Sequence, residues 1–86
     1  MSYTISITKQ AFKELELLSK KINQRISAAI DKLSQNPYPI GSKKLRGKEE
    51  AIWRIRIGDY RVLYSIKNEI KVIEIRRVGH RKEIYG

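Results

Sequence analysis

The chain has 86 residues, no cysteine, a single histidine, and only nine acidic side chains against 19 lysines and arginines. Without cysteine it can form neither a disulfide nor a thiolate metal site, and one histidine cannot build a histidine metal cluster. We therefore expect chemistry without a metal or other cofactor. No run of about 18 apolar residues is present that could cross a bilayer, and the first ten residues lack a signal peptide's apolar stretch. These features predict a cytoplasmic protein with no membrane partner.

The formal net charge is +10, which is large for so short a chain. Such a charge attracts polyanions, most simply nucleic acid or an acidic protein. Residues 1–36 carry six basic and three acidic side chains, whereas residues 37–86 carry thirteen and six. The second part of the chain is therefore where we look for a binding site.

The first 36 residues have the pattern of one strand and two helices. Apolar residues alternate over positions 3–7, as in a half-buried strand, and Thr8 is suited to cap a following helix. Apolar residues three or four apart then continue over positions 9–35. A straight helix of that length would span ~40 Å, longer than the ~30 Å expected of a compact domain this size. We expect a break between Ser19 and Asn23, which gives a helical hairpin.

The remaining residues predict an antiparallel meander. The segment Asn36–Pro39 ends the second helix, because proline cannot continue the helical hydrogen bonding. Three β-rich runs follow at positions 51–57, 60–66 and 70–78, joined by Gly58-Asp59 and by Lys67–Glu69. The predicted fold is a single α+β domain over residues 1–86. Its N-terminal strand and helical hairpin pack on a small antiparallel sheet, in the order β-α-α-β-β-β.

Three arginines are predicted to gather on one face of this sheet. Arg54 and Arg56 alternate with apolar residues that we expect to face the core, and a hairpin turn at Gly58-Asp59 would bring Arg61 close to them. Neighbouring guanidinium groups repel, so their gathering favours an exposed patch that binds a phosphate or several carboxylates. The alternative is an ordinary solvated sheet face, whose charges block aggregation.

A second basic cluster lies in the tail at positions 76–85 and contains the only histidine, His80. Histidine is the side chain best suited to transfer protons near neutral pH. The alternatives are a structural histidine and, for the nearby Tyr85, a frayed terminus.

Four segments together resemble the RelE/ParE toxins in order and spacing: Asn36-Pro37, Lys44–Gly47, Trp53–Tyr64 and Val78–Tyr85. The resemblance covers essentially the whole chain. It implies a helical hairpin on an antiparallel sheet and, in the RelE branch, cleavage of mRNA on the ribosome. It also implies an acidic RelB-like antitoxin that holds the toxin silent in a heterocomplex.

The resemblance also implies roles for individual residues. Family members carry basic residues at the positions of Arg54, Arg56, Arg61 and Arg81, and an aromatic near Tyr85 that stacks on a nucleotide. Some members have lysines where this chain has Arg54 and Arg56. An arginine cannot act as a general base, so proton transfer must be assigned elsewhere.

We hypothesise cleavage by attack of the RNA's own 2′-hydroxyl on the adjacent phosphorus. Arg54, Arg56 and Arg61 would bind the phosphate and stabilise its developing charge. His80 is the candidate proton carrier, with Glu49 or Glu50 as a weaker alternative base, while Arg81 supports the leaving group and Tyr85 stacks on a base. Further basic residues are expected to bind RNA: Lys43, Lys44, Arg46, Lys48, Arg77 and Lys82.

Two other functions are compatible with the sequence. The ParE branch shares the fold but targets DNA gyrase and is not a nuclease. A non-catalytic nucleic-acid-binding module would also account for the net charge, and it predicts salt-dependent binding without scission.

Overall fold

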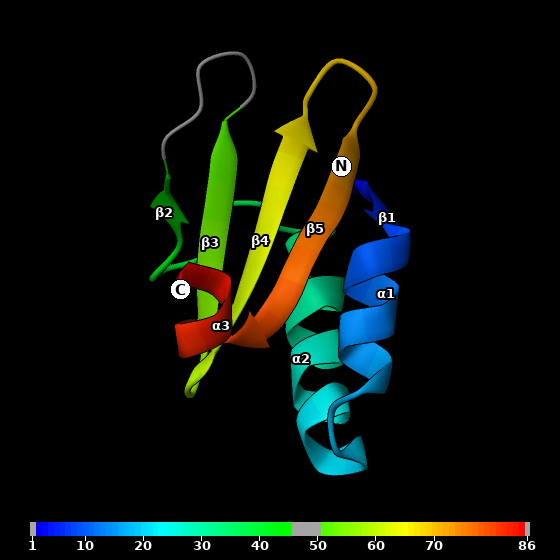
Figure 1. Cartoon of the computed structure of the whole chain (residues 1–86). Coiled ribbons are helices and arrows are strands. Elements are labelled where there is room, and N and C mark those ends of the chain that lie inside the picture. Colours follow the sequence, from blue (N-terminus) through cyan, green and yellow to red (C-terminus); the bar gives the residue numbers. More distant parts are fainter. Residues whose placement is uncertain (1, 46–50, 86) are drawn as a thin grey trace.

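The computed structural model describes residues 2–45 and 51–85, and for residues 84 and 85 the backbone alone. Figure 1 shows the elements along the chain. They are β1 (Thr4–Ile7), α1 (Lys9–Glu16), α2 (Lys20–Leu33), β2 (Lys43–Lys44), β3 (Ile52–Ile57), β4 (Tyr60–Lys67), β5 (Val72–His80) and α3 (Arg81–Tyr85). The predicted α+β class and element order are confirmed, and β2 and α3 are additions to them.

The five strands form one sheet in the order β1-β5-β4-β3-β2. Strands β3, β4 and β5 make the predicted antiparallel meander, and β2 extends it beyond β3. The sheet is not purely antiparallel, however, because β1 pairs with β5 in parallel. Alternating apolar residues indicate a strand but not its partner, and here the partner lies at the other end of the chain.

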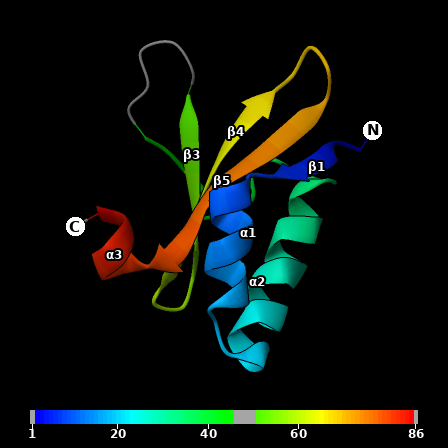
Figure 2. The same ribbon diagram turned by 45° about the vertical axis from the view of Figure 1, so that its right-hand side comes forward.

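The two long helices cover one face of the sheet, and α3 lies on the other side (Figures 1 and 2). The core is therefore a single layer between the helices and the sheet. Helices α1 and α2 and strands β3, β4 and β5 contribute its buried apolar side chains: Ala11, Leu15, Ile26, Ile30, Leu33, Ile55, Val62, Tyr64, Ile73, Ile75 and Val78. Trp53, predicted to be in the core, is half-buried and packs edge to face on Tyr38, with ring centroids 4.8 Å apart.

Side-chain caps define both helices. Thr8 accepts a hydrogen bond from the Ala11 amide at 3.1 Å, as predicted. The break comes at residues 17–19, at the start of the predicted interval, and Ser19 caps α2 by accepting from the Ile22 amide. Asn23 then donates to the Leu15 carbonyl at 2.9 Å, which also accepts the Leu18 amide at 3.2 Å, so the Asn23 side chain ties α2 to the end of α1.

The β3–β4 hairpin has the predicted two-residue turn, with Ile57 paired to Tyr60. Gly58 has φ +59°, the positive value that a type II′ turn requires at its first position. The next connection is longer than predicted, because β5 begins at Val72. Lys71, just before it, also has a positive φ of 54°.

Strand β5 contains a bulge that the sequence pattern did not predict. The register with β4 passes from Leu63↔Arg77 to Tyr64↔Ile75, so Arg76 is the extra residue of the bulge. Side chains normally alternate between the two faces of a sheet, and one extra residue shifts this alternation by one position. Two residues an even number of positions apart, one before and one after the bulge, therefore lie on opposite faces. Ile75 and Val78 consequently both reach the core although they are three positions apart.

Tyr64 ties the loop after α2 to the sheet. Its side chain is fully buried, and its hydroxyl donates to the Pro37 carbonyl at 2.7 Å. Burial raises the pKa of Tyr64 to about 12, with smaller effects from a hydrogen bond to Ser42, which lowers it, and from Tyr38, which raises it. The phenol is therefore neutral at any physiological pH, and it can act as a permanent donor.

Candidate functional site

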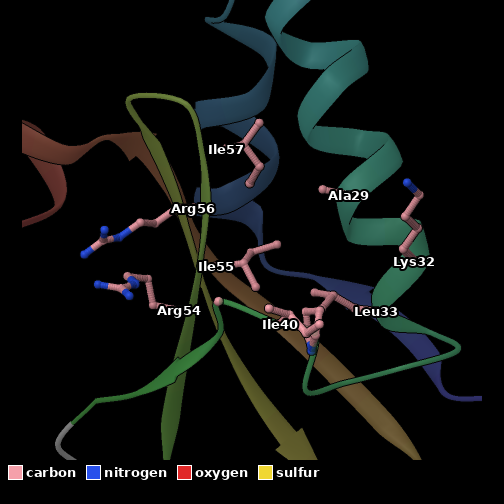
Figure 3. Close-up of a pocket in the computed structure, with 10 residues that line it drawn as sticks. Ala29, Lys32, Leu33, Ile40, Arg54, Ile55, Arg56 and Ile57 are labelled. Atoms are coloured by element: carbon pink, nitrogen blue, oxygen red, sulfur yellow. The ribbon is translucent and has the colours of Figure 1, made fainter.

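The three arginines predicted to converge share one face of the β3–β4 hairpin. Arg56 stands directly opposite Arg61, and Arg54 stands opposite Leu63. Directly opposed side chains in an antiparallel pair have Cβ atoms ~5 Å apart, so Arg56 and Arg61 are immediate neighbours. Figure 3 shows Arg54 and Arg56 pointing away from α2, while Ile55 and Ile57 point toward it. The predicted alternation of faces along β3 is confirmed.

The expectation of a fully exposed arginine patch is wrong in one respect. Arg56 is exposed, but Arg54 and Arg61 are only 8% and 7% exposed. Arg61 Nη1 donates to the carbonyls of Gly58 and Tyr60, at 3.1 and 3.0 Å, so its guanidinium folds back over its own hairpin turn. Alternation of residues along a strand indicates which face a side chain occupies but not how far it folds along that face.

These arginines have few partners. The Nε atoms of Arg54 and Arg61 are buried and make no hydrogen bond to any described residue. No ion pair joins Arg54, Arg56 or Arg61 to an acidic side chain of the described residues. Buried donors without partners and adjacent like charges are both costly, and within the described chain only the two hydrogen bonds of Arg61 to backbone carbonyls offset part of this cost. The arrangement is suited to an anionic ligand.

The predicted RNA-binding side chains have different surroundings. Lys43 pairs opposite Arg54 and so lies on the hairpin face that carries the three arginines, which we call the arginine face. Lys44 pairs opposite Trp53, and both lysines are exposed. Arg77 is held by Glu14 in an ion pair of 3.0 Å, so it is not a free cation. Lys82 is exposed on α3. Arg46 and Lys48, also predicted to bind RNA, lie outside the described residues, as do Glu49 and Glu50, the alternative candidates for the general base.

His80 does not join the three arginines. It pairs opposite Tyr60, whereas Arg61 pairs opposite Gly79, so His80 and Arg61 occupy opposite faces of the hairpin. Its ring packs edge to face on Tyr60, with centroids 5.7 Å apart. His80 and Tyr60 line a surface cavity of about 370 Å³ together with Glu14 of α1 and with Leu17 and Leu18, which follow α1. The bulge in β5 produces this placement, because it sets which face each residue after Arg76 occupies.

Helix α3 brings Arg81 to the turn end of the β3–β4 hairpin. The Arg81 amide donates to the Asp59 carbonyl at 2.9 Å, and its side chain is exposed. Tyr85 is the last residue of this helix, and its side chain lies outside the described residues. The predicted stacking role of Tyr85 therefore stays a prediction.

An apolar groove lies on the helix side of β3, next to the arginines. It has a volume of about 400 Å³ and lies between the end of α2, the loop after it and β3 (Figure 3). Ala29, Leu33, Ile55 and Ile57 supply apolar walls, and Ile40 at the rim is fully exposed. The sequence reasoning missed this groove, because it depends on how the loop after α2 packs against β3.

Glu14 is a second feature that sequence reasoning missed. Its Oε1 accepts the Val78 amide at 2.9 Å, and its Oε2 pairs with Arg77. Strand β1 pairs only with the first part of β5, and this carboxylate satisfies a backbone donor beyond that point. Nothing in the sequence distinguishes Glu14 from an ordinary charged residue on a helix.

Within the described residues, no helix is both long enough and apolar enough to span a bilayer.

Comparisons with known proteins agree on one family. A family model described as the ParE toxin of type II toxin–antitoxin systems, parDE, matches residues 5–85. Toxin RelG of Mycobacterium tuberculosis is 36% identical over 86 residues, covering 99% of this chain and 98% of that protein. A putative RelE1 toxin of Methanocaldococcus jannaschii is 31% identical over 88 residues, covering 99% and 97%. The RelE chain of the archaeal RelE–RelB complex from Pyrococcus horikoshii matches with a TM-score of 0.82 and 36% identity, covering 94% and 97%.

Proposed function

This chain belongs to the RelE/ParE family of type II toxins, and we propose that it is a ribosome-dependent endoribonuclease that cleaves mRNA and so inhibits translation. The observation that carries the proposal is the set of three arginines on one hairpin face, without a carboxylate partner among the described residues. A phosphodiester supplies the anionic oxygens that such a set lacks.

The proposed reaction needs no metal, because the RNA supplies its own nucleophile. The 2′-oxygen attacks the adjacent phosphorus, the bond from phosphorus to the 5′-oxygen breaks, and the products are a 2′,3′-cyclic phosphate and a 5′-hydroxyl. The 2′ proton must leave, and the departing 5′-oxygen must gain one. Arg54, Arg56 and Arg61 would neutralise the charge that builds on the phosphate oxygens, and Arg81 would support the leaving oxygen.

The buried positions of Arg54 and Arg61 support this role. Charge stabilisation is strongest where water is excluded and where donors are already oriented before the reaction. Arg61 is oriented in this way by its two hydrogen bonds to backbone carbonyls. The exposed Arg56 beside it would make first contact with the RNA backbone.

The test is primer extension on mRNA bound to translating ribosomes, with and without the purified protein. We expect new mRNA ends that appear only when ribosomes are present. A 2′-deoxy substitution at the mapped site should abolish cleavage, because it removes the nucleophile. Unchanged cleavage of the deoxy substrate would contradict the mechanism, and absence of any cleavage would contradict the function.

A second candidate is inhibition of DNA gyrase, as in the ParE branch. The observation that favours it is the family model, whose description names a ParE toxin. A DNA supercoiling assay with the same preparation separates the two functions. Inhibition of supercoiling with intact mRNA would favour the ParE reading, whereas salt-dependent RNA binding with neither effect would favour a non-catalytic module.

The partner we propose is a RelB-like antitoxin with an acidic and apolar segment. The Pyrococcus horikoshii relative was solved in complex with RelB. On this chain, the apolar groove lies on the helix side of β3 beside Lys32, and Arg54 and Arg56 project from the other face of the same strand. A segment with apolar and acidic side chains could fill the groove and pair with these cations if it also passed over the edge of β3. We expect a small protein of this type to be encoded next to this gene, and co-expression with it should relieve growth inhibition and yield a stable complex.

A further inference from the structure

His80 connects the last strand to the last helix through two contacts of its side chain. Its Nδ1 accepts a hydrogen bond from the Lys82 backbone amide at 3.3 Å. Its ring packs on Tyr60 with an interplanar angle of 77°. One contact is made to α3 and the other to β4, so the imidazole lies at the junction of the two elements.

Helix α3 depends on such contacts because it has only five residues. The first amides of a helix have no partner within it, and a helix of little more than one turn is not stable alone. Two hydrogen bonds hold its start: that from the Arg81 amide to the Asp59 carbonyl and that from the Lys82 amide to His80. His80 thus does what Ser, Asn or Asp usually does at the residue before a helix.

Two of the contacts that hold α3 connect it to the β3–β4 hairpin, which carries the three arginines. Asp59 lies in the β3–β4 turn, and Tyr60 directly precedes Arg61. Arg81, the first residue of α3, is therefore fixed relative to Arg61 by contacts that involve neither guanidinium. A displacement of ~1 Å between reacting groups can cost on the order of 100-fold in rate, so this placement matters.

We propose that His80 is a positioning residue: by accepting the Lys82 amide through Nδ1 and packing on Tyr60, it holds α3 and Arg81 in register with the arginine face. This role rests on the proposed function, since it concerns the geometry of the same site. It requires no contact between the imidazole and the phosphate, in keeping with a ring that lies on the opposite face of the hairpin from Arg61. Its rival is the hypothesis that His80 carries a proton in the reaction.

The positioning role uses the lone pair on Nδ1, which accepts the Lys82 amide. A side chain that supplies another acceptor at that position should therefore keep the role, whereas a side chain that supplies none should lose it. The imidazole faces a cavity that Glu14, Tyr60 and Glu83 also line.

Three substitutions separate the roles. His80→Asn places an amide oxygen near the position of Nδ1, His80→Gln places one near Nε2, and His80→Ala supplies no acceptor. In single-turnover cleavage of ribosome-bound mRNA, we expect His80→Asn to retain at least one third of the wild-type rate. We expect His80→Gln and His80→Ala to lose tenfold or more. Equal loss in all three variants, or no loss in any, would overturn the proposal.

A second measurement reads the positioning without any activity. Hydrogen exchange of the Lys82 amide in the free protein should be at least tenfold faster in His80→Ala and His80→Gln than in the wild type and His80→Asn. Unchanged exchange in His80→Ala would overturn the proposal even if the protein cleaves mRNA. Absence of cleavage by the wild type, with the exchange pattern as expected, would refute the proposed function and leave the anchoring of α3 supported.

Discussion

Replacing Arg54 with methionine should make the protein more stable and less active. Arg54 is 8% exposed, and its Nε atom is buried with no hydrogen-bond partner among residues 2–45 and 51–85. A buried donor left unsatisfied costs about 1–3 kcal/mol, and the repulsion from Arg56 and Lys43 on the same face adds to this cost. Methionine keeps a long apolar side chain at this position and removes both penalties.

We expect Arg54→Met to raise the free energy of unfolding by about 1 kcal/mol, after allowance for imperfect packing of the shorter side chain. For a domain of this size, that corresponds to a rise in melting temperature of about 4–8 °C. The rate of mRNA cleavage should fall on the order of 100- to 1000-fold, as when one donor to a developing anionic charge is removed. Urea unfolding and single-turnover cleavage measure the two quantities on the same sample.

Arg56→Met is the matched control, because Arg56 lies on the same proposed phosphate-binding face as Arg54 but is exposed. Its stability should stay within about 0.5 kcal/mol of the wild type, as for most surface substitutions, while its activity falls. If Arg54→Met instead destabilised the fold by more than 1 kcal/mol, the guanidinium would be held by favourable interactions. The interpretation of Arg54 as a buried group whose hydrogen bonding is completed only by an anionic ligand would then be wrong.

Three further predictions concern the scaffold. Tyr64→Phe should cost about 1 kcal/mol at neutral pH, since it removes the hydrogen bond to Pro37. The free energy of unfolding of the wild type should also fall between pH 10 and about 12, because a phenol whose pKa is raised on folding stabilises the folded state only while it is neutral. Urea unfolding at pH 8–12 should show this fall from Tyr64 in the wild type and not in the variant. Gly58→Ala should lower the free energy of unfolding in urea by about 1 kcal/mol through the positive φ alone. Among the described residues, an added Cβ would meet only Arg25 Nη2, at 3.7 Å, so a larger loss would indicate a clash that this geometry does not contain. Thr8→Ala should lower the unfolding free energy by about 1 kcal/mol through loss of the α1 cap, and no change would contradict the capping geometry.

The parts of the fold that the sequence predicted are those set by local pattern. Alternation along 52–57 predicted which residues of β3 face the helices, and the turn at Gly58-Asp59 predicted the register of the hairpin. Together they predicted that Arg56 and Arg61 lie next to each other. Thr8 was recognised as a cap because its chemistry acts within one helical turn. In each case the decisive interaction joins residues close in sequence.

The parts that could not be predicted depend on residues far apart. The parallel pairing of β1 with β5 joins Thr4 to Val72, and no local pattern encodes that choice. The bulge at Arg76 changes the face of every residue after it, so His80 falls on the α1 side and not among the arginines. The burial of Arg61 depends on how its guanidinium folds over the turn.

The two faces of the sheet differ in their effect: one stabilises the fold, and the other is the face that we propose binds a ligand. The face toward α1 and α2 buries apolar side chains such as Val62 and Ile75, whose removal from water favours folding. The opposite face holds Arg54, Arg56 and Arg61, whose mutual repulsion opposes folding, as do the buried Nε atoms of Arg54 and Arg61, which have no hydrogen-bond partner among the described residues. Packing alone would favour apolar residues at Arg54 and Arg61, so the fold does not account for arginine at these positions, whereas the proposed anionic ligand would. An anion that binds only the folded protein at this face would stabilise it, and under the proposed function we expect RNA and an acidic antitoxin segment to compete for the same face.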